Sequence, residues 1–172
     1  MNYTINSPLI PLFFKQSISY NMEEKIGYIT TTNITRQLLG EMSYRVKIFN
    51  TEVSIIEQKK EENKRNWNIY ILTEENKRKI GKLILNSNTT QTLKYAETHY
   101  VFMHENSIYK IKKPYMQSKK SFSMIDDNKK EIAIHEGTDY LSTKRKIKIL
   151  NSDGDSFDAS IILVMSVIKY IS

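Results

Sequence analysis

Hydrophobic and polar residues alternate along most of the chain, with the two-residue period that is typical of strands with one buried face. Residues 42–49 alternate cleanly and place Tyr44, Val46 and Ile48 on one face. The pattern recurs in segments 66–72, 79–85, 100–103, 107–112, 122–125, 131–134 and 146–150. Polar turn signals separate these segments. Many short strands at such spacing predict an all-β sandwich or barrel built from consecutive hairpins.

Residues 157–171 break the alternation, because they are apolar almost without interruption. Their β-branched residues favour a strand, whereas their length favours a helix, since buried strands rarely exceed about eight residues. Asp155, with Asp158 three residues later, is suited to cap the start of a helix. A helix that is apolar nearly all round must be buried on nearly every side. We therefore expect a mainly β fold, a closed antiparallel β-barrel with a buried hydrophobic C-terminal helix at about 156–171.

The organisation along the chain predicts one domain, as expected for 172 residues. We expect 1–11 to form a loose N-terminal arm and 12–172 to form the barrel. The tripeptides Lys25–Gly27 and Lys79–Gly81 are alike, but a match this short in a chain rich in lysine and isoleucine is weak evidence for a repeat.

The charge balance is basic, with 26 Lys and Arg against 19 Asp and Glu, a net charge of +7. Such a balance favours anionic partners, although compositional bias alone would also produce it. The absence of cysteine excludes disulfides, thiolate nucleophiles and cysteine-bound zinc. The apolar run 161–171 is shorter than the about 20 residues that a membrane-spanning helix needs. We expect a cytoplasmic protein that is at most peripheral to a membrane.

Catalytic and metal-binding patterns are absent from the sequence. Asn151, Asp153, Asp155 and Asp158 form an acidic cluster, but it lacks the glycine and the glutamate of a calcium-binding loop. His99 and His104 are five residues apart in a strand-like run, which sends them to opposite faces. We therefore expect no enzyme activity, no cofactor and no metal site.

Two stretches resemble the tubby C-terminal-like superfamily, which includes phospholipid scramblases and LURP-one-related proteins. The first, Phe122–Ile134, is similar to a hairpin with an acidic turn, and the second, Asp155–Ile168, to an acidic turn followed by an apolar helix. The resemblance, to a small bacterial-type member, implies a tubby-like barrel threaded by its C-terminal helix. It also implies recognition of phosphoinositides through basic residues on one strand. No membrane-length helix or cysteine-rich region accompanies it, so we do not expect lipid translocation.

The nearest match to such a basic strand lies late in the chain. Alternation places Lys110 and Lys112 on one face, and Lys113, Lys119 and Lys120 follow. These five residues are the candidate anion or lipid site, on a non-enzymatic module that binds anionic phospholipid or phosphoinositide headgroups. A solvated outer face beside a basic loop is the more common explanation for such lysines.

Two other functions stay open. Aromatic residues interleaved with lysine on an exposed sheet can stack nucleic-acid bases, and Tyr109, Tyr115, Phe122 and Tyr140 are the candidates for that role. Aromatic residues in alternating strands are more often part of the core, so nucleic acid is the less favoured partner. A module that binds only protein partners is the third alternative.

Overall fold

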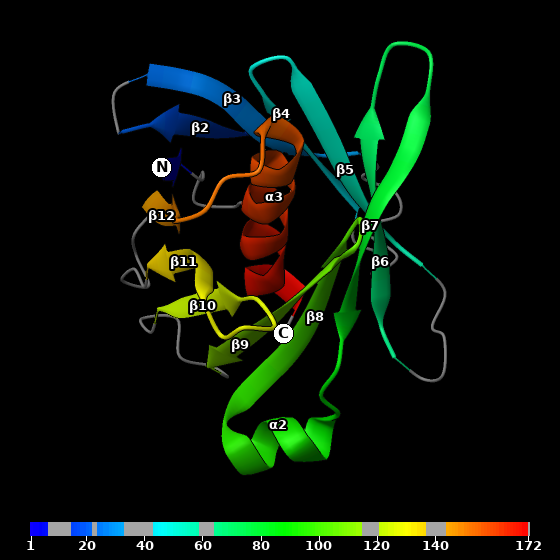
Figure 1. The fold of residues 1–172 in the computed structure, drawn as a ribbon, viewed down its shortest axis with the longest axis vertical. Helices are drawn as coiled ribbons and strands as arrows, with labels where there is room; N and C mark the ends of the chain where they lie inside the picture. The colour runs from blue at the N-terminus through cyan, green and yellow to red at the C-terminus, as the bar shows by residue number, and fades with distance from the viewer. Residues whose placement is uncertain are drawn as a thin grey trace.

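The computed structural model describes residues 1–6, 15–21, 24–32, 43–58, 64–114, 121–136 and 144–171. Within them, twelve strands form one closed antiparallel barrel, in which each strand pairs with its neighbours in sequence and the last pairs with the first (Figure 1). The strands are β1 (Asn2–Asn6), β2 (Gln16–Tyr20), β3 (Glu24–Thr31), β4 (Ser43–Ile48), β5 (Thr51–Glu57), β6 (Asn66–Leu72), β7 (Lys77–Leu85), β8 (Glu97–His104), β9 (Ser107–Pro114), β10 (Phe122–Ile125), β11 (Glu131–Glu136) and β12 (Lys144–Ile149). A short helix, α2 (Thr89–Tyr95), links β7 to β8.

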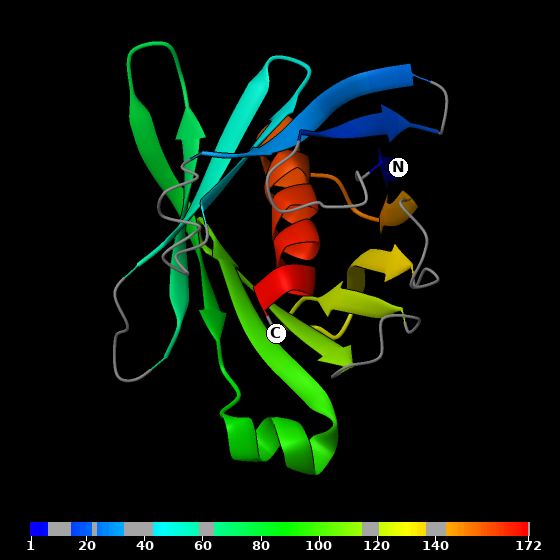
Figure 2. The ribbon, with the colours of Figure 1, turned by 180° about the vertical axis from the view of Figure 1, so that it is seen from behind.

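Helix α3 (Asp155–Ile171) runs through the barrel, as both ribbon views show (Figures 1 and 2). Every side chain from Phe157 to Ile168 is buried, including those of Ser160 and Ser166. A twelve-stranded barrel is too wide for strand side chains alone to fill, so the helix supplies the core. The predicted closed barrel with a buried C-terminal helix is thus confirmed. Among the described residues, no helix has the length and hydropathy to cross a membrane.

The start of α3 differs from the predicted cap. Gly154, with a φ of 95°, precedes the helix, and its carbonyl oxygen accepts a hydrogen bond of 3.0 Å from the Asp158 backbone N–H. Asp155 is the first residue of the helix rather than its cap. Asp158 instead turns its side chain into the barrel, where the Tyr3 hydroxyl donates to it.

The N-terminus is also different from the expected loose arm. Residues 2–6 form β1, which pairs with both β12 and β2 and so closes the barrel. Tyr3 and Ile5 are buried, and the Met1 ammonium donates to the Ile149 carbonyl oxygen at 2.6 Å. The sequence pattern failed here because two apolar residues in five give too little alternation to recognise. Residues 7–11 of the expected arm lie outside the described part of the chain.

Strand β3 contains a β-bulge, the first of three similar bulges in the barrel. Gly27 pairs with Ile18, but the next pair is Lys25 with Ser19, so Ile26 is an extra residue on β3. A Cβ on Gly27 would collide with a carbonyl oxygen of β4, which explains why glycine occupies this position.

The same bulge recurs twice. In β7 the extra residue is Ile80, followed by Gly81, and in β11 it is Ile132, followed by Ala133. Each extra isoleucine accepts a backbone hydrogen bond from the residue that directly follows the facing strand: Phe49 to Ile26 at 3.1 Å, Glu105 to Ile80 at 2.8 Å and Leu150 to Ile132 at 2.8 Å.

The barrel is therefore three four-stranded units, β2–β5, β6–β9 and β10–β12 completed by β1. The similar tripeptides Lys25–Gly27 and Lys79–Gly81 occupy equivalent positions in the first two units. The chain termini interrupt the third unit, whose fourth strand comes from the other end of the sequence.

Candidate functional site

The predicted lysines do not form one surface. Lys110 and Lys112 are exposed on the outside of β9, as alternation predicted, while Ile111 between them is fully buried. The Lys110 ammonium lies 3.0 Å from an Asp127 carboxylate oxygen, so a local ion pair already accounts for it. Lys113 points the other way, into the barrel. Lys119 and Lys120 lie outside the described residues, and the structure places neither of them.

Lys113 belongs to a pair of basic side chains at the C-terminal end of α3. Its ammonium donates to the Ile168 carbonyl oxygen at 3.2 Å. Arg145, which is 1% exposed, donates from Nη1 to the Ser166 carbonyl oxygen at 3.3 Å and from Nη2 to Gln16 Oε1. The C-terminal end of a helix carries partial negative charge, and its last four carbonyls, which in α3 begin at Ile168, lack partners within the helix. These two cations therefore stabilise the helix end inside the barrel, and grouping Lys113 with the outer lysines was wrong.

The acidic cluster lies at the opposite end of α3. Asp158 is buried, and its carboxylate accepts a 3.1 Å hydrogen bond from the Tyr3 hydroxyl. Burial raises the pKa of Asp158, and burial beside this carboxylate raises the pKa of Tyr3. Asp153 and Asp155 are exposed. In the part of the chain that the structure describes, no group of three acidic or histidine side chains is placed to hold a metal ion.

The predicted stacking residues and histidines are largely internal. Tyr109 is half-buried and stacks on Phe102, and Phe122 is buried against His135 at a ring distance of 4.7 Å. His104 is buried, whereas His99 faces outward, as expected for opposite faces. Tyr115 and Tyr140 lie outside the described residues. The described aromatic candidates therefore offer no exposed platform for bases.

A lysine column that sequence reasoning did not select runs along the outside of β12. Lys144, Lys146 and Lys148 are all exposed, because the alternate residues Arg145, Ile147 and Ile149 point into the barrel. Figure 1 shows β12 next to the N-terminus, where β1 closes the barrel.

Small neutral polar residues line the next two strands. Opposite the lysine column, β1 presents outward Asn6, Thr4 and Asn2 in register with Lys144, Lys146 and Lys148. Beyond them, β2 contributes Ser17 and Ser19, paired with Asn6 and Thr4. Thr4 is only 6% exposed, Asn2 is exposed, and Asn6, Ser17 and Ser19 are partly exposed, so this surface is a strip of small polar side chains beside the lysine column. We call it the polar strip.

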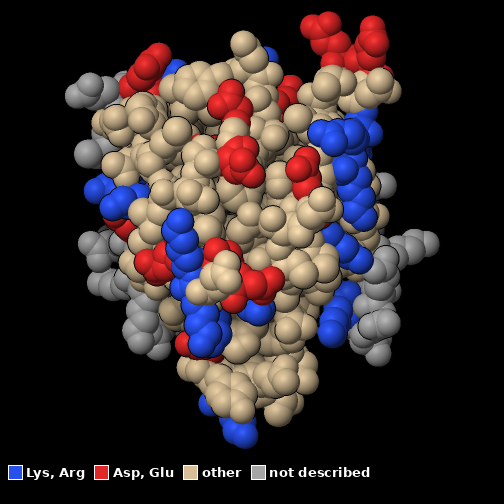
Figure 3. All heavy atoms as spheres, in the orientation of Figure 1, with Lys and Arg blue, Asp and Glu red and all other residues tan. Residues whose placement is uncertain are grey.

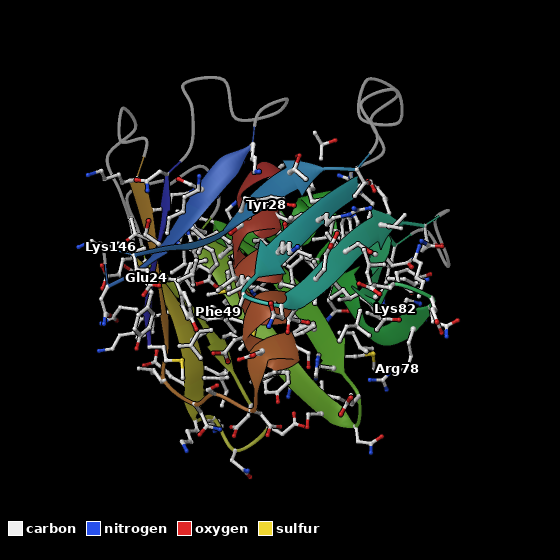
Figure 4. The ribbon with its side chains drawn as sticks, turned by 90° about the horizontal axis from the view of Figure 1, so that it is seen from above. Glu24, Tyr28, Phe49, Arg78, Lys82 and Lys146 are labelled. Atoms are coloured by element: carbon white, nitrogen blue, oxygen red, sulfur yellow. The ribbon has the colours of Figure 1, made fainter. Side chains whose placement is uncertain are left out.

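Basic residues also flank the far side of the polar strip. On β3, Lys25 pairs with Ser19, and Tyr28 pairs with Ser17. The Lys15 ammonium lies 3.6 Å from the centre of the Tyr28 ring. Seen from above in Figure 4, Lys146 and Glu24 lie on the same side of the barrel, with Tyr28 further along the wall. A ligand on the polar strip would thus meet lysines on both sides.

A pocket of about 330 Å³ opens where the lysine column meets β1. Its lining is Asn2, Tyr3, Thr4, Asn21, Glu136, Lys146, Ile147 and Lys148. We call it the β12 pocket. Lys146 lies 3.9 Å from a carboxylate oxygen of Glu136, and both side chains are about half exposed. The pocket therefore combines two exposed ammonium groups, one carboxylate and several neutral hydrogen-bonding groups.

A second basic surface lies on the other side of the barrel. It includes Arg78, Lys79 and Lys82 of β7, around a hollow of about 580 Å³ that is more open to solvent than the β12 pocket. Figure 3 shows Lys and Arg side chains in a column along that edge, below the acidic tip of the β6–β7 hairpin. Glu105 also lines this hollow. The more enclosed β12 pocket is the better candidate for a defined small ligand.

Sequence reasoning missed the β12 pocket for a physical reason. The alternation of lysine with arginine and isoleucine in 144–149 does predict a strand with a lysine face. The neutral side of the pocket, however, comes from β1, which lies more than 140 positions away and whose pattern is too short to recognise. Only the closure of the barrel brings Asn2 beside Lys148.

The site thus defined holds groups suited to binding an anion rather than to covalent catalysis. No protein-family model, curated protein or solved structure matches the chain.

Proposed function

We propose that the protein is a non-enzymatic binding module that recognises anionic phospholipid headgroups at a membrane surface through the β12 pocket. The observation that carries the proposal is the pair Lys146 and Lys148, exposed side by side beside the neutral residues Asn2 and Thr4. Phosphate oxygens accept charge-assisted hydrogen bonds from ammonium groups. Asparagine and threonine side chains add neutral donors at the same place.

The outward position of Lys146 and Lys148 supports a role for them in binding a ligand rather than in stabilising the fold. Their side chains are exposed, whereas the structural cations Arg145 and Lys113 point inward and are bonded to α3. An exposed lysine on one strand face costs little stability and can contact an anionic surface. Each lysine near such a surface contributes about 1 kcal/mol to the free energy of binding. The lysine column is thus a better candidate than the predicted group around Lys110.

We further propose that the chain is a tubby-like protein. The sequence resemblance implies a closed barrel threaded by a C-terminal helix, and the twelve-stranded barrel around α3 has that organisation. The hairpin in the resemblance corresponds to β10 and β11, joined by a turn in which Asp126 Oδ1 accepts from the Lys130 backbone N–H at 2.8 Å. Fold organisation supports the assignment to a class, while the ligand rests on the pocket.

Vesicle co-sedimentation tests the proposed function. The wild-type protein is compared with the double variant Lys146→Gln/Lys148→Gln and with the control Lys110→Gln/Lys112→Gln, which removes the same charge from β9. Binding to anionic vesicles should weaken by about 2 kcal/mol, roughly thirtyfold, in the first variant. The control should bind within a few-fold of wild type. Neutral vesicles should bind none of the three.

Two results would contradict the proposal. Equal loss of binding in both variants would mean that net charge alone attracts the protein to the vesicles. Displacement by single-stranded DNA, or complete loss of binding at near-physiological salt, would mean a general polyanion interaction.

A further inference from the structure

Glu136 is an unusual component of a pocket for anions. It is the one carboxylate in the described lining of the β12 pocket, and it faces Lys146 across the β11–β12 register. A carboxylate beside a phosphate site weakens the binding of any purely anionic ligand through like-charge repulsion. Its presence therefore raises the question of which ligand it would favour.

The ion pair of Glu136 with Lys146 is too long to satisfy either group. The nearest N–O distance is 3.9 Å, well beyond a charge-assisted hydrogen bond of about 2.7–2.9 Å. The two side chains are 48% and 52% exposed, so each can turn toward a ligand. Lys148, one step along the column, faces the apolar Ile134 on β11. The pocket thus offers two cationic positions with one anionic position beside them.

Resting on the proposed function, we propose that the β12 pocket selects headgroups that carry an ammonium group together with two anionic groups, as the phosphoserine headgroup does. Lys146 and Lys148 would receive the phosphate and the carboxylate of such a ligand, and Glu136 would accept hydrogen bonds from its ammonium. The amide groups of Asn2 and Asn21, at the rim, supply neutral donors and acceptors.

The same arrangement disfavours two other classes of anionic lipid. Clustered phosphates on an inositol ring bring negative charge against Glu136 with no ammonium to offset it. Phosphatidylglycerol has the same net charge as phosphatidylserine but leaves Glu136 without a partner. Selectivity in such a site comes from the repulsive group as much as from the attractive ones.

Matched vesicles test the inference. Phosphatidylserine and phosphatidylglycerol are compared at equal mole fraction in neutral lipid, with wild type, Glu136→Gln and the control Glu131→Gln. Glu131 is an exposed carboxylate on the same strand but outside the lining of the β12 pocket. Wild type should prefer phosphatidylserine by about two- to fivefold, the range expected for one exposed ion pair. Glu136→Gln should bring the ratio close to one, and Glu131→Gln should leave it unchanged.

The outcomes separate this inference from the proposed function. If Lys146→Gln/Lys148→Gln weakens binding to both vesicles but Glu136→Gln leaves the lipid ratio unchanged, the selectivity is wrong and the proposed function stands. If the lysine variant binds like wild type, the proposed function itself fails. Calorimetry with free O-phosphoserine separates the two sources of the headgroup: binding without vesicles assigns the soluble compound, and a lipid preference without such binding assigns the membrane lipid.

Discussion

Strands β8 and β12 occupy equivalent places in the second and third units of the barrel, yet they present different chemistry to solvent. Their equivalent outer residues are His99 with Lys144, Val101 with Lys146 and Met103 with Lys148. The fold therefore accepts neutral and apolar side chains at these positions. The equivalent positions of β4 in the first unit are Arg45 and Lys47, so only β8 lacks basic residues there. Because β8 forms the same barrel wall without them, the lysines of β12 are not required by the barrel itself.

The inner faces of the same two strands differ as well. Tyr100 on β8 is equivalent to Arg145 on β12, and both are buried. Among the described residues, the Tyr100 hydroxyl has no hydrogen-bond partner, whereas Arg145 bonds to Gln16 and to the Ser166 carbonyl oxygen. One side chain fills space and the other holds the end of α3.

The largest effect should come from Val164→Asp in α3, because all three units pack around this helix. Val164 is fully buried, and an unpaired carboxylate there should cost about 3–5 kcal/mol, enough to unfold a domain of ordinary stability. Urea unfolding followed by circular dichroism measures the loss. Val164→Ala is the matched control, and it should lose only about 1–3 kcal/mol. A folded, stable Val164→Asp protein would show that the helix is not the core.

The next effect separates Arg145 from Tyr100. Arg145→Met leaves Gln16 and the Ser166 carbonyl oxygen without this donor, so the free energy of unfolding should fall by about 2–4 kcal/mol. Tyr100→Phe removes a hydroxyl that has no hydrogen-bond partner among the described residues, so stability should change by less than about 1 kcal/mol or increase. Equal changes at the two positions would mean that the hydrogen bonds of Arg145 contribute no more to stability than the Tyr100 hydroxyl does.

A smaller effect concerns the other end of α3 and depends on pH. Burial raises the pKa of Asp158, so the folded protein favours the neutral carboxyl group. The stability contributed by this group is therefore complete below the unfolded pKa near 4 and is lost as pH rises through the raised folded pKa. Asp158→Asn keeps an acceptor for the Tyr3 hydroxyl without the charge. Its stability relative to wild type should grow as pH rises above about 4 in a series of thermal unfolding curves; a shrinking difference would contradict the assignment.

The sequence predicted the elements whose pattern is long or uninterrupted. Segments 66–72 and 122–125 match β6 and β10, and the apolar run at the end of the chain is α3. The five-residue strands β1 and β2 were not singled out, because short alternation is easily lost among polar residues. The three-unit organisation stayed hidden for a different reason: the units share a bulge geometry that needs only isoleucine followed by a small residue.

The candidate site was harder to predict than the fold. Alternation correctly placed Lys110 and Lys112 outside, but it could not show that Asp127 lies beside Lys110. The same alternation sends Lys113 inward, toward the end of α3. The β12 pocket depends on contact between the two ends of the chain, and a local pattern carries no information about that contact. The distribution of basic residues in the sequence therefore pointed to the region around Lys110. The β12 pocket is identified only by the register between β1 and β12.

The most direct test of the central claim is to map the bound headgroup on the isotope-labelled protein by nuclear magnetic resonance, with short-chain phosphatidylserine as the probe. The account predicts that amide shifts concentrate at Asn2, Thr4, Lys146 and Lys148, while the equivalent outer residues of β8 stay unchanged. Shifts centred on Lys110 and Lys112, or spread over every lysine-bearing strand alike, would contradict it.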